Sequence, residues 1–498
     1  MPSNFATRAR LVAFVSLVAA GFTLQAQNAF SPGGPDFAVA GARAGDQTAP
    51  QAALGLNGGW LVWQDNAADG DGLGINAMRL GTGFTGAGAV FRVNQQGVGD
   101  QEKPQVALLS NGGAVVVWQG GRFGFQKIYA RVLSSAGVPL GGDILVNTYT
   151  NFHQITPAIA TLTDGNVIVV WASFNQDGSL LGIYGQRLNA AGQKLGAEFR
   201  INQVTTYNQR TPALAALPNA SFVVTWVSEL QRGSSSVDIC ARLFGASGNA
   251  LGAEFAVNTS AVKTCANPAV AATSAGDFCV AWSQNSRTAR NATDATATNE
   301  VSTTDEGNVP SGWDVYSRMF NGSGIATGEP RLINSMTYGD QFAPKVAAFG
   351  QDFLAVWTSL GQDGSREGTF GQFLHRDGGA HGVEFRVNTT TISRQIHSTL
   401  ATDGSTRFLV VWSTFNAGTS FDLMGRAYEL IRAQVRVTPQ GVELAWNTQP
   451  GNVYQVQASS DLGAWNNFGT ARIASGWSDA IVIPPSAAAE QYRVVRVP

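Results

Sequence analysis

The chain has 498 residues, a formal net charge of −2 and only 13% charged residues. A near-neutral chain offers no basic field for a phosphate backbone, so its composition argues against nucleic-acid binding. The 58 glycines among short apolar runs are typical of many short β-strands joined by tight turns, and the length allows more than one domain.

The pattern of residues 1–26 predicts a secretory signal peptide. Two arginines precede an apolar run from Leu11 to Phe22, and Ala26 offers a small side chain for cleavage. This run is short for a membrane span and no later stretch is long enough, so we expect no span after cleavage. We therefore expect a monomeric protein that is secreted, periplasmic or held at the cell surface.

A tryptophan that ends an apolar run recurs through residues 31–430. It recurs in steps of 53 to 56 residues, except for one step of 75 that contains the Thr-, Ala- and Asn-rich insertion 286–312. Because each tryptophan has the same place in its repeat, we expect burial between sheets rather than stacking on a sugar. The tryptophans are Trp63, Trp118, Trp171, Trp226, Trp282, Trp357 and Trp412.

Each repeat has the pattern of four strands. In the second repeat these are "PQVALL", "AVVVWQ", "KIYARVL" and "GDILVN", and glycine turns join the first strand to the second and the third to the fourth. Seven such repeats predict an all-β, seven-bladed β-propeller, with an open β-solenoid as the alternative. Phe37 and Val39 match a fourth strand, which the last repeat lacks, so we expect this N-terminal strand to close the ring.

The third repeat, "NVIVVWASFNQDGSLLGIYGQRL", carries the motif in its fullest form. It resembles the repeats of secreted bacterial propeller-like proteins, with a pattern of the type VVVWxSxxQDGSxxGIYGQR…EFxVN. The resemblance covers about Ser31 to Leu430. It implies export and a propeller fold, and it implies no particular activity.

Residues 433–498 depart from the repeat. Apolar and polar residues alternate, and the "YQVQxSxDLxxW" pattern resembles small modules at the ends of many secreted bacterial proteins. This resemblance implies a fibronectin-III-like β-sandwich. Its expected core residues are Trp446, Tyr454, Val456, Leu462 and Trp465.

An asparagine and, seven residues later, a glutamine recur in the connections between repeats. Such amides can surround a ligand, but their repetition favours the capping of backbone groups in a fixed turn. Two histidines lie beside repeat glutamines. The candidate ligand-binding residues are Gln101, Gln154, Gln209, Gln341, Gln395, His153 and His397.

The loop after the second strand is rich in Asp, Asn and Gly. Carboxylate and amide oxygens are ligands for Ca²⁺, but no complete calcium loop with a closing Glu is present, so an Asp-Gly turn is the alternative. We expect no other cofactor. The candidate calcium ligands are Asp65, Asn66, Asp69, Asp71, Asp177 and Asp363.

The three cysteines, Cys240, Cys265 and Cys279, lie in one region of the chain. Their odd number leaves at least one thiol free and allows at most one disulfide among them. The fold therefore does not depend on a framework of disulfides.

In an up-and-down blade, the connections between repeats and the loops after each second strand lie on the same face, called the loop face below. We expect an exported, non-catalytic binding or cell-surface protein that contacts a glycan or a protein there, because the repeated polar positions have the character of turns. One alternative is a carbohydrate-active enzyme, a glycoside hydrolase or polysaccharide lyase, which needs unrepeated acids or histidines near the channel mouth. Another is a purely structural envelope component.

Overall fold

The computed structural model describes residues 29–32, 35–285, 312–438, 440–459, 464–484 and 491–497. The predicted signal peptide and all but the last residue of the insertion lie outside these residues. The chain divides into two units, Asp36–Ala427 and a smaller one formed by Met1–Pro35 with Tyr428–Pro498. The described residues are all-β, with no α-helix, and so contain no helix able to cross a membrane.

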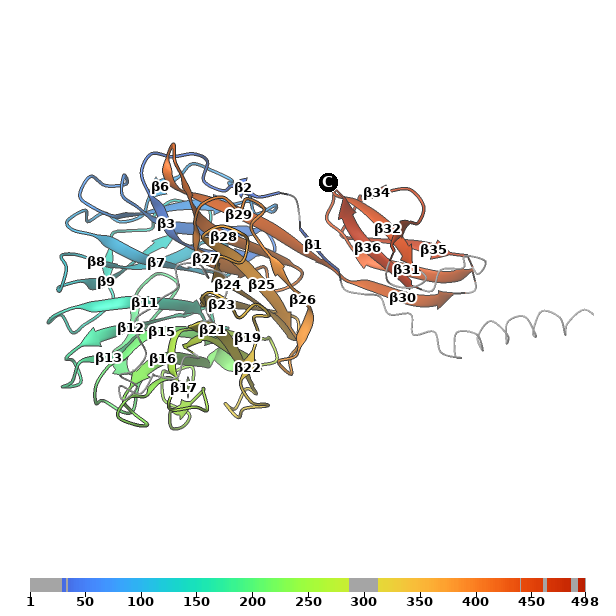
Figure 1. Ribbon diagram of the computed structural model, residues 1–498. Coiled ribbons are helices and arrows are strands. Elements are labelled where there is room, and N and C mark those ends of the chain that lie inside the picture. Colours follow the sequence, from blue (N-terminus) through green and yellow to red (C-terminus); the bar gives the residue numbers. More distant parts are fainter. Residues whose placement is uncertain are drawn as a thin grey trace, which may run out of the picture. The chain divides into compact units, whose positions relative to one another are not determined.

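In the larger unit the strands of four repeats each form a four-stranded antiparallel sheet (Figure 1). The strands of the fourth and fifth repeats form one eight-stranded sheet, and those of the last repeat belong to a five-stranded one; the strands of each repeat are called its sheet below. The first contains β3 (Gln47–Gly55), β4 (Gly58–Asp65), β5 (Gly74–Leu80) and β6 (Phe91–Arg92). The second contains β7 (Gln101–Leu108), β8 (Ala114–Gly120), β9 (Lys127–Leu133) and β10 (Ile144–Leu145). The third contains β11 (Gln154–Thr161), β12 (Val167–Phe174), β13 (Leu181–Leu188) and β14 (Lys194–Arg200).

The later sheets follow the same order. The fourth contains β15 (Gln209–Ala216), β16 (Phe222–Glu229), β17 (Val237–Phe244) and β18 (Phe255–Ala256), with a short 3-10 turn at Pro218–Ala220. The fifth contains β19 (Thr264–Ala272), β20 (Phe278–Asn285), β21 (Trp313–Phe320) and β22 (Arg331–Leu332). The sixth contains β23 (Gln341–Phe349), β24 (Asp352–Leu360), β25 (Glu367–Leu374) and β26 (Ala380–Arg386). The last contains β27 (Gln395–Thr402), β28 (Arg407–Asn416) and β29 (Ser420–Ile431), with β2 (Phe37–Ala38) beside β29.

The second strand of each sheet carries the apolar run, and its residues are covered on both faces. Every residue of β8 is buried, for example. Burial of the repeat tryptophans is confirmed, since each is at most 1% exposed. Fully burying one large apolar side chain stabilises the fold by about 1.5–3 kcal/mol, so these strands supply much of the stability.

The hydrophobic core is divided into clusters that each join two neighbouring sheets. One cluster packs Val115 and Val117 of the second sheet against Val169 and Trp171 of the third. Others join the third sheet to the fourth, the fourth to the fifth and the fifth to the sixth. The larger unit therefore has a core made of successive interfaces between sheets.

Arginines of the third strands also connect neighbouring sheets. Arg242 Nη1 donates to the backbone oxygen of Ile201 at 3.0 Å, and Arg318 Nη1 donates to that of Val257 at 2.9 Å. In each case the acceptor residue directly precedes the repeat asparagine of the previous sheet. The glutamine that replaces arginine in the sixth repeat, Gln372, bonds to backbone within its own sheet instead.

The first and last sheets are neighbours. Phe37 of β2 lies opposite Gly425 of β29, and one apolar cluster contains residues of β4, β5, β28 and β29. The guanidinium of Arg407 donates to the backbone oxygens of Thr82 and Leu56, which belong to turns of the first sheet. Hydrogen bonding does not make one closed sheet of the described strands: only the fourth and fifth sheets are joined, through Val237 and Thr264.

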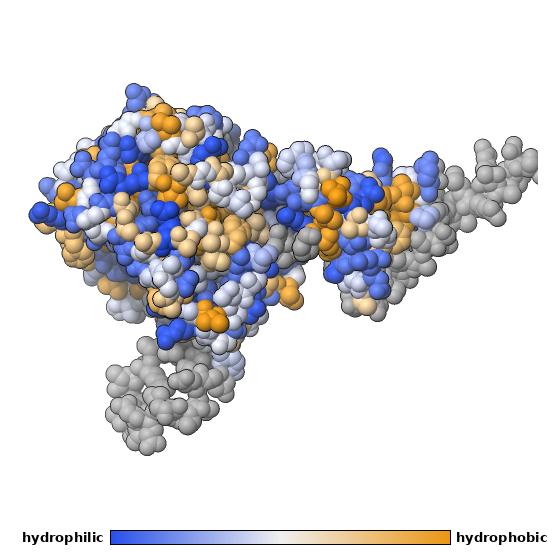
Figure 2. All heavy atoms as spheres, turned by 90° about the horizontal axis from the view of Figure 1, so that it is seen from above, coloured by the Kyte–Doolittle hydropathy of each residue, from blue (hydrophilic) through white to orange (hydrophobic). Residues whose placement is uncertain are grey.

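The arrangement of the larger unit is propeller-like. The first strands of the sheets lie toward its middle, and the short fourth strands lie toward its rim (Figure 1). On the face shown in Figure 2, apolar residues are scattered among polar ones.

The smaller unit contains two antiparallel sheets. One has β30 (Ala433–Thr438), β31 (Gly441–Asn447) and β35 (Ser478–Ile483); the other has β32 (Val453–Ser459), β33 (Asn466–Asn467), β34 (Arg472–Ile473) and β36 (Gln491–Val497). β1 (Ala29–Pro32) pairs with the end of β29.

The expected core of the smaller unit is found in part. Trp446, Tyr454 and Val456 are buried in one cluster, as expected. Trp465 is only half-buried and has the guanidinium of Arg493 4.4 Å from its ring centre, whereas Leu462 lies outside the described residues. The fibronectin-III-like assignment stays a prediction.

Candidate functional site

The five candidate glutamines are buried and bonded within the protein. Gln101 Nε2 donates to the backbone oxygen of Gly99 at 2.7 Å, and its Oε1 accepts from Asn94 Nδ2 at 2.9 Å. Asn94 Oδ1 in turn accepts from the backbone N–H of Ile75 at 2.8 Å. The Asn-to-Gln bond recurs at 2.9–3.4 Å in each of the five repeats that have this pair. These amides hold the connection between repeats in one shape and are covered from any ligand.

The candidate calcium loops contain similar internal bonds. Asp69 Oδ2 accepts from Asn94 Nδ2 at 2.9 Å and Asp363 Oδ2 accepts from Asn388 Nδ2 at 2.9 Å, while Asp177 has the same contact at 3.4 Å. The other carboxylate oxygen of each accepts a backbone N–H two residues later. These contacts have the geometry of Asp turns fastened to the repeat asparagine.

In the first repeat, the remaining calcium candidates also have protein partners. Asp65 accepts from the side chains of Trp63 and Asn76, Asn66 pairs with Asp46, and Asp71 accepts from the backbone N–H of Gly99. The six candidates lie in three separate repeats, the first, third and sixth. Calcium binding stays a prediction, and these oxygens already accept hydrogen bonds from groups of the protein.

All three cysteines are free and buried. Burial raises the pKa of Cys240 and of Cys265 to about 12. Because a thiolate is the reactive form, neither thiol has the character of a catalytic nucleophile.

The two candidate histidines occupy different environments. His153 is half-buried, and its ring stacks on Phe174 with ring centres 4.9 Å apart. His397 lies at a bulge in β27, where part of its surface is exposed and its imidazole is largely desolvated.

A bulge interrupts the first strand of every repeat at an equivalent position. The residue at each bulge has a φ of +49° to +54°, although none is glycine, and it directly precedes the repeat proline or, in the last repeat, Ser398. This conformation costs about 1–3 kcal/mol and persists only where its surroundings enforce it. The bulge residues are Ala49, Lys103, Thr156, Thr211, Asn267, Ala343 and His397.

Side chains of the preceding sheet hold several bulges in place. The backbone N–H of Lys103 donates to Gln64 Oε1 at 3.0 Å, and that of Thr156 donates to Gln119 Oε1 at 2.8 Å. The N–H of Ala343 donates to Ser283 Oγ at 2.9 Å. The bulge is thus a fixed feature of the scaffold, whereas the side chain it presents differs from repeat to repeat.

The first strands surround a cavity of about 420 Å³, called the central cavity below. Six of the bulge residues line it, as does Lys345. The described lining residues contain two lysines, Lys103 and Lys345, and no Asp or Glu. The central cavity is therefore suited to an anionic group.

The pKa values of two basic side chains in this region, His397 and Lys345, are lowered. Burial, then the charges of Lys345 and Arg394, lower the pKa of His397 from its ordinary value of 6.5. Burial also lowers the pKa of Lys345. A neutral imidazole beside an ammonium group provides a proton acceptor next to a cation.

Exposed aromatic side chains gather on the loop face. Phe123 is 95% exposed and Phe125 is 67% exposed, both in the loop between β8 and β9. Three others lie in connections between repeats and a fourth, Phe415, lies at the end of β28; no other described aromatic of the larger unit is as exposed. Exposed rings gathered at one face are typical of a surface that binds another molecule. The six are Phe123, Phe125, Phe152, Tyr207, Tyr338 and Phe415.

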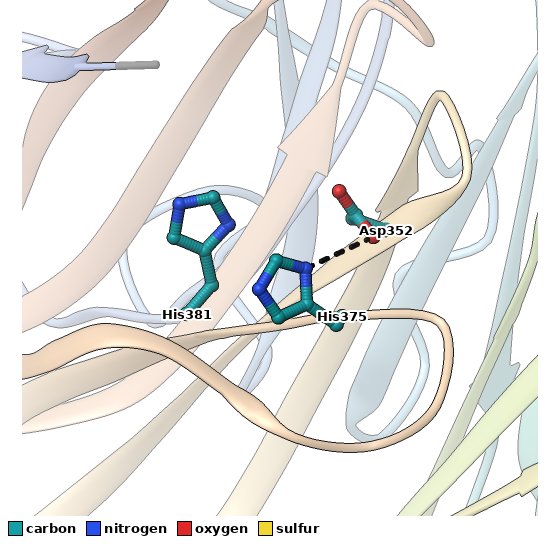
Figure 3. Close-up of side chains that lie close together, drawn as sticks. All are labelled: Asp352, His375 and His381. Atoms are coloured by element: carbon teal, nitrogen blue, oxygen red, sulfur yellow. Dashed lines mark ion pairs between the residues drawn. The ribbon is translucent and has the colours of Figure 1, made fainter. Parts of the chain in front are cut away.

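A group of side chains able to bind a metal ion lies at the end of the sixth sheet that is opposite the loop face (Figure 3). Asp352, His375 and His381 each offer a ligand atom, and these atoms lie within 4.8 Å of one another. Among the described residues, this is the one such group of three. Sequence reasoning missed it because the two histidines are separated by a turn rather than by HxH or HxxxH spacing.

The lysines of the central cavity were also missed. Two positions of the repeat could have revealed them: Lys103 is the residue before a repeat proline, and Lys345 is the residue after one. Across the repeats the first position holds Ala, Lys, Thr, Thr, Asn, Ala and His, and such variation within a fixed frame marks a place free to carry function.

Comparison with known proteins gives a likeness in fold. No family model matches the chain, and no curated protein matches it. An α-L-arabinanase of Penicillium chrysogenum, solved with arabinobiose, has 15% identity and a TM-score of 0.43, over 66% of this chain and 92% of that one. The polysaccharide lyase Uly1 has 9% identity and a TM-score of 0.45, over 76% and 90%. The β-propeller domain of the Trilobed protease from Pyrococcus furiosus has 8% identity and a TM-score of 0.44, over 77% and 94%.

These findings correct our main expectation of a non-catalytic binding protein. The similar structures include an α-L-arabinanase, an α-L-arabinofuranosidase and a polysaccharide lyase. The likeness itself concerns the fold alone, so the reaction has to be argued from the residues of this chain.

Proposed function

We propose that this protein is a polysaccharide lyase that acts on an acidic glycan at the central cavity. The observation that carries the proposal is the placement of Lys103 and Lys345 in the cavity wall, with His397 at the equivalent bulge of the last repeat. These three basic groups are not repeated at their positions elsewhere in the chain. The cavity volume of about 420 Å³ lies within the range of small-ligand sites.

The scaffold we propose is a seven-bladed propeller in which β2 completes the last blade. Support comes from the pairing of Phe37 with Gly425 and from the apolar cluster between the first and last sheets. The predicted signal peptide supports export, and the resemblance of the repeat to secreted bacterial proteins agrees with it. A single chain carries all the residues that the proposal uses.

The reaction would be a β-elimination on a uronate residue. The neutral imidazole of His397 takes the proton from the carbon next to the carboxylate, and the electron pair forms a carbon–carbon double bond. The bond to the glycosidic oxygen then breaks, and that oxygen takes up a proton from the imidazolium or from water. Lys345 and Lys103 would pair with the substrate carboxylate and stabilise the negative charge that develops there. A bound carboxylate would favour the charged ammonium of Lys345 and so offset its desolvation.

Hydrolysis is less well supported at this site. A glycoside hydrolase usually needs two carboxyl groups on either side of the scissile bond. The described cavity lining has none, and the nearby Glu367 accepts two bonds from Arg394, at 2.6 and 2.9 Å. This ion pair keeps that carboxylate ionised and occupied, since it lowers the pKa of Glu367.

The test is a screen of uronate-containing polysaccharides, with neutral polysaccharides as the matched controls. The readout is the ultraviolet absorbance of the new double bond. We expect activity on an acidic glycan, and a loss of about 100-fold or more in kcat for His397→Ala. Thr211→Ala, at an equivalent bulge without a basic group, should retain most of the activity. Cleavage of a neutral glycan without a double bond would overturn the lyase proposal in favour of hydrolysis.

A further inference from the structure

Asp352, His375 and His381 lie at the end of the sixth sheet that is opposite the loop face, away from the site of the proposed reaction. Asp352 is the first residue of β24, His375 follows β25 and His381 lies in β26. The register places Phe353 opposite Leu374 and Phe373 opposite His381, so two turns bring these three residues together. The loop face lies at the other end of the same strands.

The three side chains are oriented toward one another. His375 Nδ1 lies 3.7 Å from Asp352 Oδ1, and the two imidazole rings stack with centres 4.4 Å apart. Figure 3 shows the ring of His375 between His381 and Asp352. Asp352 Oδ1 also accepts the backbone N–H of Arg376 at 3.2 Å, which fixes the carboxylate against the turn that follows β25.

The repeat gives no structural reason for this set. In the third sheet, the residues at the equivalent positions are Asn166, Asn189 and Leu195. The turn there is formed in the same way, because the N–H of Asn189 bonds to the oxygen of Gln193 at 2.9 Å and that of His375 bonds to the oxygen of Gly379 at 2.8 Å. The fold therefore builds this turn without two histidines and an acid.

We propose that Asp352, His375 and His381 bind a divalent transition-metal ion of the Zn²⁺ class. Two imidazole nitrogens and one carboxylate oxygen suit Zn²⁺, Co²⁺, Ni²⁺ or Cu²⁺ better than Ca²⁺ or Mg²⁺. Three protein ligands leave a coordination position open for water or for a group from outside the chain.

The ligand atoms need only a small movement to reach an ion. Ligands about 2.1 Å from a tetrahedral ion lie about 3.4 Å apart, whereas these atoms lie within 4.8 Å of one another. The side chain of His375 is 48% exposed, so it can rotate without disturbing the core. A bound ion would fasten the turn before β24 to the turn between β25 and β26.

The experiment measures Zn²⁺ binding to the full chain, purified without a histidine tag, by calorimetry and by the melting temperature. We expect one ion per chain and a rise in melting temperature, because a ligand that binds only the folded state stabilises it. His375→Ala and His381→Ala should each weaken binding by at least about tenfold, and Asp352→Asn should do so while keeping an acceptor for Arg376. His153→Ala is the matched control and should bind as the wild type does.

Two results would overturn the proposal. One is a wild-type chain that binds no Zn²⁺, Co²⁺ or Ni²⁺ at micromolar concentrations. The other is binding that survives in the His375 and His381 variants, which would assign the ion to another site. Circular dichroism of each variant shows whether the fold is retained, and the conservative variants His375→Gln and His381→Gln repeat the test if an alanine variant unfolds.

Discussion

At the scale of single residues, the buried amides hold the scaffold, whereas the proposed chemistry depends on side chains at or beside the bulges. Asn202 is 1% exposed and makes three contacts at 2.7–3.1 Å, to the N–H of Ile183, the oxygen of Val204 and Gln209 Oε1. By contrast, His397 lies at a bulge where part of its surface is exposed. Repeated polar residues hold the backbone, and unrepeated ones are available for ligands.

Asn202→Ala should lower the free energy of unfolding by about 2 kcal/mol, because the buried N–H of Ile183 loses its acceptor. Urea denaturation measures this change. Asn249→Ala, at an exposed turn, is the control and should change the free energy by less than about 0.5 kcal/mol. Equal effects of the two variants would contradict a special role for the buried amide.

Stability should fall as the pH decreases from about 6.5. Folding lowers the pKa of His397 below 6.5, so between the folded and unfolded pKa values the unfolded state binds more protons. The contribution is fully present above 6.5 and is lost as the pH falls through the lowered pKa. His397→Gln should reduce the difference in melting temperature between neutral and acidic buffer. His153 and His381, whose pKa values are also lowered, contribute in the same direction.

At the scale of elements, strand and turn patterns were predictable because periodicity reports burial directly. The run "AVVVWQ" predicted a fully covered second strand, and every residue of β8 is buried. The calcium prediction stays open, but the bond from Asn94 Nδ2 to Asp69 Oδ2 joins residues 25 apart and could not be read from the pattern of the loop. The spacing of the repeat marked His397 as a candidate, but its left-handed φ at a bulge and the pairing of His375 with His381 across a hairpin could not be derived from spacing alone.

Exposed rings on the loop-face elements should contribute to substrate binding with little effect on stability. The double variant Phe123→Ser, Phe125→Ser should raise KM for the polysaccharide several-fold and leave kcat nearly unchanged, since both rings lie away from the cavity lining. Val383→Ser, at an exposed position in β26, is the control. An equal fall in kcat and in kcat/KM would contradict a role confined to binding.

At the scale of the whole molecule, the contacts between the first and last sheets are the ones that close the proposed ring. Arg407 is 4% exposed, forms an ion pair with Asp403 at 2.7 Å and donates to carbonyls of the first sheet. It also lies 4.6 Å from the ring centre of Phe84. The contacts of Arg407 with Thr82, Leu56 and Phe84 span more than three hundred residues of sequence, so no local pattern could have predicted them.

Arg407→Met should lower the free energy of unfolding by about 3 kcal/mol, because it leaves the buried carboxylate of Asp403 without its cation. Limited proteolysis should then cut the first sheet earlier than in the wild type. Arg122→Met, at an exposed position, is the control. An unchanged protease pattern in Arg407→Met would argue against ring closure at this interface.

The division of the core into interfaces between successive sheets has an evolutionary consequence. Duplication or loss of one repeat in the gene would preserve the kind of interface each sheet makes with its neighbours, while changing the angle between them and therefore the width of the opening they surround. In the ring proposed here, the number of copies would set how large a molecule can enter, and one codon per copy, at the bulge, would set its charge. Such a lineage could alter size selection and charge selection by separate mutational routes.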